Sequence, residues 1–341
     1  MDTIPVKAVW QARKRLLPYL PKTPLVYSTP LSGHCQTPVW LKLETLQPSG
    51  SFKLRGAMNV LLSMSEESRQ KGVAAFSTGN HGLAVAYAAK QAQTQATIFV
   101  SESVPPAKQA ALQASGATIT VTGRSQDEAG EACIRHCQQT GQTLVPPFDD
   151  DTIIAGQGTI ALELLDDLPE LETVIAGLSG GGLLSGIGLV LKHTDPTIQV
   201  AGASIVNGAA MEASLVAGHP VEVAEQPTVA DSLLGGIGLD NRWTFKAVQR
   251  YVDTRVQVPE EDIARAMAYL YEHHHLLVEG AAAIGAAALL NGSIRPKGPT
   301  AVVITGASIH AQEHDRIVRP YLNEAMDSFQ PKKARTASTK L

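Results

Sequence analysis

Short apolar strands alternate with helical patterns along most of this chain, and this alternation constrains the fold more than any other feature. The strands are rich in β-branched residues and do not alternate with polar ones, which is typical of parallel strands covered on both faces. The first predicted series is helix 53–64, strand 73–77, helix 81–91, strand 96–100, helix 107–115, strand 118–121 and helix 126–139. The second is helix 154–165, strand 173–176, helix 183–192, strand 199–203, helices 260–273 and 281–291, and strand 300–304.

Two such series predict an α/β protein with two doubly wound, open-sheet lobes and an active site between them. The chain has 341 residues, which is longer than a single core usually supports and also favours two domains. We expect a crossover near Pro146 and Pro147. The expected larger domain comprises residues 1–50 and 147–325, the smaller one residues 51–146, and residues 326–341 a polar, basic, disordered tail.

Composition argues against several classes of protein. The balance of 28 Lys+Arg against 32 Asp+Glu gives a net charge of −4, which disfavours a broad nucleic-acid or anionic-membrane surface. No stretch approaches about 18 uninterrupted apolar residues, so we expect no membrane span. The N-terminal segment is typical of an amphipathic helix, with Val6, Val9, Trp10 and Leu16 or Leu17 available to one face. The 3 cysteines are unevenly spaced and form no disulfide framework, which indicates a reducing cytoplasm.

Two groups of potential metal ligands favour other interpretations. Cys133, His136 and Cys137 lie in one helical run and lack a second pair of ligands. The three consecutive histidines at 273–275 would point in different directions on a helix. We therefore expect no metal site.

A lysine in PSGSFKLRGAMN (48–59) is the first candidate for chemistry. Lys53 follows small, hydroxyl-bearing residues and precedes a predicted helix. A lysine amine forms a Schiff base with a carbonyl cofactor when burial removes enough water to release its proton. The alternative is a solvated salt-bridge partner, which is the commoner role of lysine.

A glycine-rich segment, SGGGLLSGIG (179–188), follows a predicted strand and opens a helix. Consecutive glycines let backbone amides approach a ligand, and the helix adds its positive N-terminal end, so the segment predicts a cup for one phosphate. Ser185 stands where a dinucleotide motif needs glycine, and no lysine ends the loop as in a nucleotide-binding P-loop. The alternative is a plain turn between strand and helix.

The segment STGNHGLAVAYAA (77–89) also leaves a strand and enters a helix. Its first residues are Ser77, Thr78, Gly79, Asn80 and His81. Their polar side chains, with the free N–H groups of a helix start, suit a carboxylate. The alternative is simple capping, with Asn80 as the N-cap.

Two further polar residues stand next to apolar runs. Thr305 ends a predicted apolar strand, where an open α/β sheet presents its ligand groups, and Glu279 follows Leu276, Leu277 and Val278. Each side chain either bonds a buried heteroatom or caps the next turn.

Together these residues resemble the fold type II pyridoxal-phosphate (PLP) enzymes, and specifically the threonine/serine dehydratase (ammonia-lyase) and serine racemase branch. The resemblance extends over residues 23–308, and its most specific pieces are SFKLRGA, STGNH, AGQGT and SGGGLLSG. It implies a tryptophan synthase β-like fold, with PLP between the two lobes and bound mainly by the larger one.

The resemblance also implies a role for each candidate residue. Lys53 would hold PLP as a Schiff base and then take the substrate Cα proton, while Thr78 occupies the position of the acid/base serine of serine racemases. Asn80 would bond the cofactor's phenolic oxygen, Thr305 would meet its pyridine nitrogen, and Glu279 would also contact the cofactor. The backbone amides expected at the phosphate are those of Ser179, Gly180, Gly181, Gly182 and Leu183. The residues expected at the substrate carboxylate are Ser77, Thr78, Gly79, Asn80 and His81.

The implied reaction is α,β-elimination of water from a small β-hydroxy amino acid, L-threonine or L-serine by default, giving a 2-oxo acid and ammonia. A hydroxyl such as that of Thr305 cannot hold the pyridine nitrogen protonated as an aspartate would, so the cofactor is a weaker electron sink. This favours elimination over transamination.

Several alternatives remain open at this point. The segment ADSLLGGIGLDNRWTF (230–245) resembles dehydratases assigned to hydroxyectoine use, so 3-hydroxyaspartate or a hydroxyectoine-derived compound is an alternative substrate. Serine racemisation, β-replacement and a non-catalytic sensor are alternative functions. Ser204 stands where metal-activated relatives have a glutamate ligand, which again disfavours a metal. The resemblance implies a homodimer.

Overall fold

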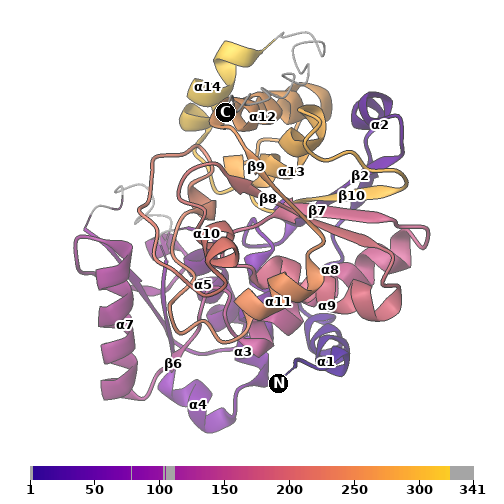
Figure 1. The fold of residues 1–341 in the computed structure, drawn as a ribbon. Coiled ribbons are helices and arrows are strands. Elements are labelled where there is room, and N and C mark those ends of the chain that lie inside the picture. The colour runs from indigo at the N-terminus through magenta and orange to yellow at the C-terminus, as the bar shows by residue number, and fades with distance from the viewer. Residues whose placement is uncertain (1–2, 78, 103, 105–111, 323–341) are drawn as a thin grey trace.

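The computed structural model describes residues 3–77, 79–102, 104 and 112–322. Within these ranges the chain forms two sheets flanked by helices, which confirms the predicted α/β class (Figure 1). The larger sheet has the strand order β1-β2-β10-β7-β8-β9, and within it β1 alone runs antiparallel to its neighbour. Its strands are β1 (Leu25–Tyr27), β2 (Val39–Leu43), β7 (Thr173–Gly177), β8 (Gln199–Ile205), β9 (Thr254–Val258) and β10 (Thr300–Ile304).

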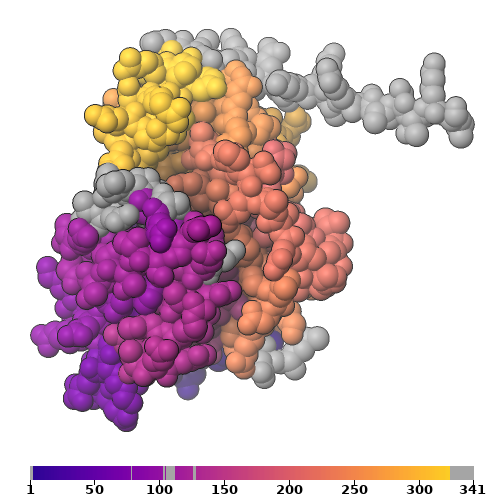
Figure 2. All heavy atoms as spheres, turned by 90° about the vertical axis from the view of Figure 1, so that its left-hand side faces the viewer, coloured from indigo at the N-terminus to yellow at the C-terminus, as the bar shows by residue number. Residues whose placement is uncertain are grey.

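The smaller sheet is fully parallel and has the order β5-β4-β3-β6. Its strands are β3 (Val73–Phe76), β4 (Ala96–Val100), β5 (Thr118–Val121) and β6 (Thr143–Leu144). In Figure 2 the purple and magenta mass, which includes the smaller sheet, adjoins the salmon-to-yellow mass, which includes β8, β9 and β10 of the larger sheet. The predicted domain boundaries after residues 50 and 146 remain a prediction, and the tail 326–341 lies outside the described residues.

Helices cover both faces of each sheet. Around the larger sheet they are α1 (Val6–Leu16), α2 (Thr29–Cys35), α8 (Asp151–Asp167), α9 (Gly182–Thr194), α10 (Ala210–Ala217), α11 (Thr244–Tyr251), α12 (Glu260–His274), α13 (Gly280–Leu290) and α14 (Ala311–Val318). Around the smaller sheet they are α3 (Lys53–Ser63), α4 (Glu66–Lys71), α5 (Asn80–Gln91) and α7 (Gln126–Thr140). The described part of the chain also contains three 3₁₀ turns: η1 (Glu44–Leu46), η2 (Asp231–Leu233) and η3 (Arg319–Tyr321). Of the predicted helix 107–115, residues 107–111 lie outside the described part, and 112–114 are helical.

Alternate residues of each central strand enter different cores, as a doubly wound sheet requires. In β7, Ile175 packs into the core with α12 and α13, whereas Val174 and Ala176 pack into the core with α8 and α9. The smaller sheet divides likewise, with Ile98 of β4 facing α3 and α5 and Phe99 facing α7. Both faces of the central strands are therefore buried, and ligand groups concentrate at the ends of these strands.

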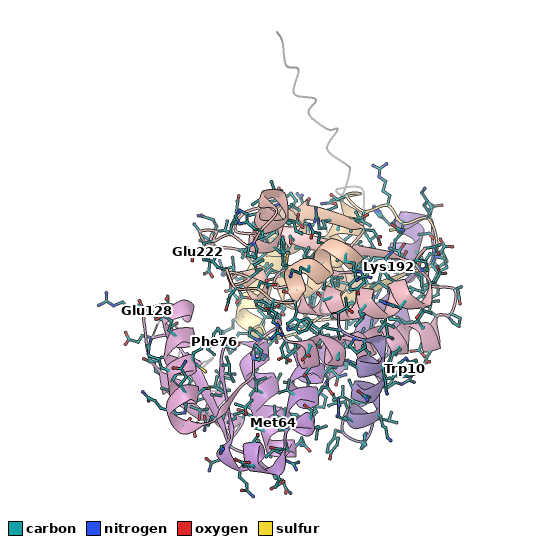
Figure 3. All side chains as sticks on the ribbon, turned by 60° about the horizontal axis from the view of Figure 1, so that its bottom comes forward. Trp10, Met64, Phe76, Glu128, Lys192 and Glu222 are labelled. Carbon is teal, nitrogen blue, oxygen red and sulfur yellow. The ribbon has the colours of Figure 1, made fainter. Side chains whose placement is uncertain are left out.

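The N-terminal helix forms as expected, but one of its apolar residues was misplaced. Val9 and Leu16 are buried, whereas Trp10 is 52% exposed and lies on the outer side of α1 (Figure 3). The guanidinium of Arg13 lies 5.5 Å from the Trp10 ring centroid, so a cation–π contact replaces burial. No helix among the described residues is long and apolar enough to cross a membrane.

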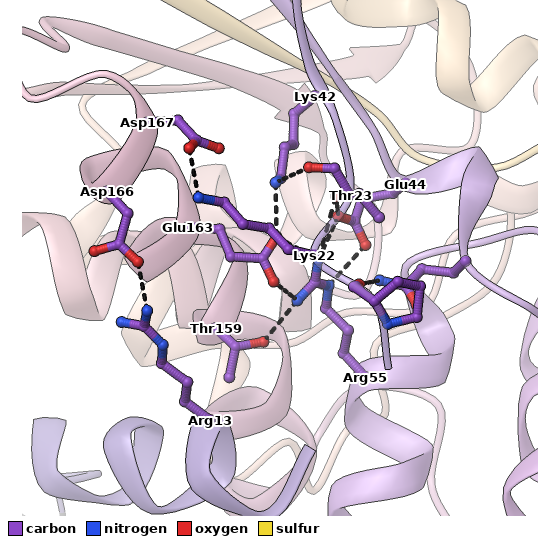
Figure 4. A network of polar contacts seen from close by, with 12 residues as sticks. Arg13, Lys22, Thr23, Lys42, Glu44, Arg55, Thr159, Glu163, Asp166 and Asp167 are labelled. Atoms are coloured by element: carbon purple, nitrogen blue, oxygen red, sulfur yellow. Dashed lines mark hydrogen bonds and ion pairs between the residues drawn. The ribbon is translucent and has the colours of Figure 1, made fainter. Parts of the chain in front are cut away.

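A buried ionic network fastens α3 to the larger sheet (Figure 4). Arg55 contacts both oxygens of Glu44 at 2.8 Å and reaches Glu163 of α8 at 2.6 Å. Lys42 of β2 completes the network with a 2.6 Å contact to Glu163 and a 2.7 Å bond to the carbonyl of Thr23. Two cations and two anions balance, so the group tolerates burial. The helix that carries Lys53 is thus held rigidly.

Candidate active site

The segment before Lys53 is bonded to the end of β10 through main-chain groups. The N–H of Phe52 donates to the carbonyl of Thr305 at 3.0 Å, and the N–H of Ala307 donates to the carbonyl of Gly50 at 3.1 Å. Ser51 and Gly306 form an isolated antiparallel bridge between these two bonds. Lys53 and Thr305 are therefore brought together from distant parts of the chain.

The Lys53 amine is held in an apolar setting. Its Nζ donates to the carbonyl of Pro147 at 2.7 Å, and the ring centroids of Phe52 and Phe148 lie 5.4 and 6.0 Å from it. Burial lowers its pKa to about 8, although the charge of Glu279 acts in the opposite direction. The amine is part-buried and donates to a backbone carbonyl, which favours a reactive amine over a solvated salt bridge.

The glycine-rich segment forms the expected turn from β7 into α9. Gly181 is the N-cap of α9 and has φ +86°, a conformation that favours glycine. A Cβ on Gly180 would lie 2.3 Å from Cδ1 of Phe148, and one on Gly181 would lie 2.8 Å from Val248. Side chains are excluded at both positions, so the loop presents peptide groups at a helix N-terminus. This geometry suits a phosphate, and the amides of Ser179, Gly180, Gly181, Gly182 and Leu183 remain the predicted ligands.

Asn80 does not cap its helix as the alternative interpretation supposed. Gly79 is the N-cap of α5, and Asn80 is the first helical residue. Its Nδ2 donates to both carboxylate oxygens of Glu279, at 2.7 and 3.0 Å. The other amide atom, Oδ1, is buried and has no hydrogen-bond partner within the part of the chain that the structure describes. This oxygen is therefore available to accept a hydrogen bond from a bound ligand.

Glu279 stands at the start of α13 and faces several polar groups. Burial, followed by the charge of Asp231, raises its pKa to about 7, while hydrogen bonds from Asn80, the Ser308 N–H and Ser232 act in the opposite direction. The Ser308 N–H donates to Oε2 at 3.2 Å. The carboxyl group is therefore poised between its two protonation states near neutral pH.

The remaining residues of the STGNH segment divide in their roles. His81 Nε2 donates to the carbonyl of Val145 at 2.8 Å, and burial followed by the charge of Lys53 lowers its pKa to about 3. The ring is neutral and occupied, so His81 can offer a carboxylate only its backbone N–H. Ser77 Oγ accepts from the Gly79 N–H at 3.3 Å, and Thr78 lies outside the described residues.

The sequence analysis did not identify the segment 147–149, which packs against Lys53 and the glycine turn. Pro147 and Phe148 contact Lys53, and Phe148 also packs beneath the glycine turn. Asp149 then accepts from the backbone N–H groups of Arg242, Trp243 and Thr244 at the start of α11. An aromatic residue between a proline pair and an acidic run, at the predicted crossover, was the available indication.

Ser204, which stands where metal-activated relatives have a glutamate ligand, makes a hydrogen bond within the fold. Ser204 donates its hydroxyl to the carbonyl of Leu178 at 2.5 Å. Within the described ranges, no group of three or more His, Cys, Asp or Glu side chains has an arrangement that would hold a metal ion.

These features suit an α/β enzyme that uses a phosphorylated carbonyl cofactor. The lowered pKa of Lys53, the side-chain-free turn at Gly180 and Gly181, and the unpartnered Oδ1 of Asn80 all fit PLP. The chain belongs to the pyridoxal-phosphate-dependent enzyme family, whose model matches residues 16–306. PLP is accordingly its cofactor.

Curated and solved relatives cover nearly the whole chain. An L-threonine ammonia-lyase of Thermotoga maritima is 40% identical over 316 residues, which are 92% of this chain and 78% of that protein. An L-threonine ammonia-lyase of Geobacter sulfurreducens is 37% identical over 307 residues, which are 90% of this chain and 76% of that protein. The structure of maize serine racemase is similar with a TM-score of 0.87 and 30% identity, covering 94% of this chain and 98% of that one.

Proposed function

We propose that this protein is an ammonia-lyase that eliminates water from a small β-hydroxy amino acid, L-threonine or L-serine, and releases a 2-oxo acid and ammonia. The observation that carries the proposal is the main-chain bond from Phe52 to Thr305, because it brings a proton-accepting amine and an uncharged hydroxyl to one site. The two L-threonine ammonia-lyases similar to this chain support the same reaction.

The proposed cofactor ligands lie on segments that adjoin both the smaller and the larger sheet. Lys53 would hold PLP covalently, the amides of residues 179–183 its phosphate, Asn80 its phenolic oxygen and Thr305 its pyridine nitrogen. Glu279 would act beside Asn80. When bound, PLP withdraws electrons from the bonds of the substrate Cα and so acidifies its proton.

Lys53 is then the proposed base for that proton. Its pKa of about 8 leaves a useful neutral fraction near neutral pH, and the carbonyl of Pro147 gives the free amine a fixed orientation. The rings of Phe52 and Phe148 limit water around it. Lys53 is thus suited to accept a proton from a substrate held close by.

Thr305 and the start of α5 would govern the fate of the substrate once its Cα proton has left. A threonine hydroxyl bonds the pyridine nitrogen without protonating it, which favours loss of the β-hydroxyl over transamination. The N–H groups at the start of α5, including those of Asn80 and His81, would hold the substrate carboxylate together with Ser77, Gly79 and Thr78.

A substrate panel tests this function. The PLP-loaded protein is incubated with L-threonine, L-serine, 3-hydroxyaspartate and hydroxyectoine-derived amino acids, and 2-oxo acid release is measured. Release from threonine or serine is expected in the wild type and in Lys90→Ala, a matched exposed lysine on α5, and is absent in Lys53→Ala. Release from neither, with turnover of another panel member or conversion of L-serine into D-serine, would refute the proposal.

We further propose a cytoplasmic homodimer whose two domains follow the boundaries at residues 50/51 and 146/147. All four strands of the smaller sheet lie within residues 73–144, which supports this partition. Light scattering of the purified protein tests the dimer, and limited proteolysis tests the boundaries.

A further inference from the structure

The contact between Asn80 and Glu279 is fixed from every side. Glu279 accepts from the Ser308 N–H at 3.2 Å as well as from the Asn80 amide at 2.7 and 3.0 Å. A Cβ on Gly306 would lie 2.7 Å from Oε1 of Glu279 and 3.0 Å from Nδ2 of Asn80. A side chain at residue 306 would therefore displace the pair, and its geometry depends on the glycine at this position.

The charge of Glu279 decides which way the Asn80 amide turns. An ionised carboxylate only accepts hydrogen bonds, so Asn80 must offer it the NH₂ group, which leaves Oδ1 facing elsewhere. Asn80 is only 8% exposed, and its Oδ1 is buried without a hydrogen-bond partner among the described residues. A protonated carboxyl group gains an O–H donor, so the amide can turn over, bond it through Oδ1 and present Nδ2 instead.

We propose that Glu279 is a positioning residue that, through Asn80, selects whether an acceptor or a donor faces the phenolic oxygen of the cofactor. This rests on the proposed function, which places Asn80 at that oxygen. With Glu279 charged, Oδ1 faces the phenolic oxygen, which must keep its proton to donate. With Glu279 protonated, Nδ2 faces it and stabilises the oxyanion. One proton is thus held either by Glu279 or by the phenolic oxygen, and Asn80 links the two.

The charges around Glu279 place this exchange near neutral pH. Burial and the nearby charge of Asp231 favour the protonated form, with a pKa of about 7, while hydrogen bonds from Asn80, Ser308 and Ser232 favour the charged form. Lys53 is the facing cation, since Glu279 raises the pKa of its amine. Small changes in the local charge therefore decide the position of the proton.

The visible spectrum of bound PLP measures this linkage without turnover. We compare PLP-loaded wild type, Glu279→Gln, Asn80→Ala and the double variant over about pH 5.5–9. The wild type is expected to show a spectral transition between about pH 6 and 8. Glu279→Gln should move it down by about one unit or more, because the neutral amide can donate to Oδ1 of Asn80 and leave Nδ2 for the phenolic oxygen. In the Asn80→Ala background the same substitution should shift it by less than about 0.3 unit, since the mediating amide is absent.

The controls separate a positioning role from a structural one. Glu212→Gln removes another carboxyl group whose pKa is raised by burial, and it should leave the transition in place. An undiminished shift in the Asn80→Ala background overturns the proposal, because the effect then bypasses Asn80. So does a wild-type spectrum without a transition in this range, which decides the matter even if Glu279→Gln fails to fold. Failure of wild type to release oxo acid would instead contradict the proposed function.

Discussion

Substitution of Gly180 by alanine tests the phosphate cup directly. The added Cβ would lie 2.3, 2.5 and 2.6 Å from three ring atoms of Phe148, well inside normal carbon–carbon contact. Two of these atoms, Cγ and Cδ1, lie near the base of the ring rather than at its far end, so a small rotation of the ring does not remove the clash. Overpacking of this kind costs about 1–3 kcal/mol.

The strain falls on the turn that would hold the phosphate. If most of it is relieved by displacement of the turn, PLP affinity should fall about 5- to 150-fold, since each 1.4 kcal/mol is about tenfold. Titration of the apoprotein with PLP, followed by its visible absorbance, measures the dissociation constant. Thermal unfolding of the same sample separates lost affinity from lost stability.

Two further variants sharpen the result. Gly33→Ala is the matched control, because a Cβ there has nothing within 4 Å, and PLP affinity should not change. Phe148→Ala removes the ring that the new methyl group meets, so affinity lost in Gly180→Ala should be recovered in the double variant. A Gly180→Ala protein that binds PLP within about twofold of wild type would refute the phosphate cup, since even a 1 kcal/mol loss predicts more.

Four further outcomes are expected. The rate at which the apoprotein captures PLP should rise as the pH increases through about 8, because only the neutral amine of Lys53 attacks an aldehyde; stopped-flow absorbance tests this, and a flat profile contradicts it. Arg55→Met should lose about 3–5 kcal/mol of stability in denaturant unfolding, because it leaves the buried carboxylate of Glu44 without its cation while Glu163 keeps Lys42, whereas the exposed Arg316→Met should change it by less than about 1 kcal/mol. The pKa of Glu279 is raised on folding, from 4.5 to about 7, so the native state binds the extra proton; its contribution to stability is present below about pH 4.5 and is lost as the pH rises through about 7. The unfolding free energy of the apoprotein should therefore decline more over this range in wild type than in Glu279→Gln, and equal slopes would contradict the assignment. Thr305→Asp should increase conversion of bound PLP to pyridoxamine phosphate during turnover, measured chromatographically; large conversion in the wild type would contradict the role given to the hydroxyl.

The strands whose bounds could be predicted are uninterrupted apolar and β-branched runs, and they include the half-exposed strand β5, Thr118–Val121, as well as buried ones. Strands β4 and β10 have the expected bounds, Ala96–Val100 and Thr300–Ile304, because each is a continuous apolar run. The central strand β2 was missed because Lys42 interrupts its apolar run, and the edge strands β1 and β9 were missed because β1 has only 3 residues and Arg255 and Gln257 divide β9. The strand geometry of β1 and β9 comes from pairing with β2 and β8, which a local pattern does not contain.

The candidate site divides in the same way. The lysine and the glycine turn could be selected as candidates because the chemistry that they suggest lies within a few neighbouring residues. The segment around Asn80 alone favoured a helix cap, because its hydrogen-bond partner, Glu279, is 199 residues away. Phe148 was missed for a related reason: its role is to fill the space left by glycines on another segment.

The main-chain hydrogen bonds between residues 50–52 and 305–307 have a consequence for how such a site can change. Bonds between main-chain groups survive most side-chain replacements. The spacing between the reactive amine and the strand-end residue is therefore inherited with the fold, whereas the identity of that residue is free to vary. New chemistry can arise here by single substitutions, without rebuilding the framework that aligns the reactants.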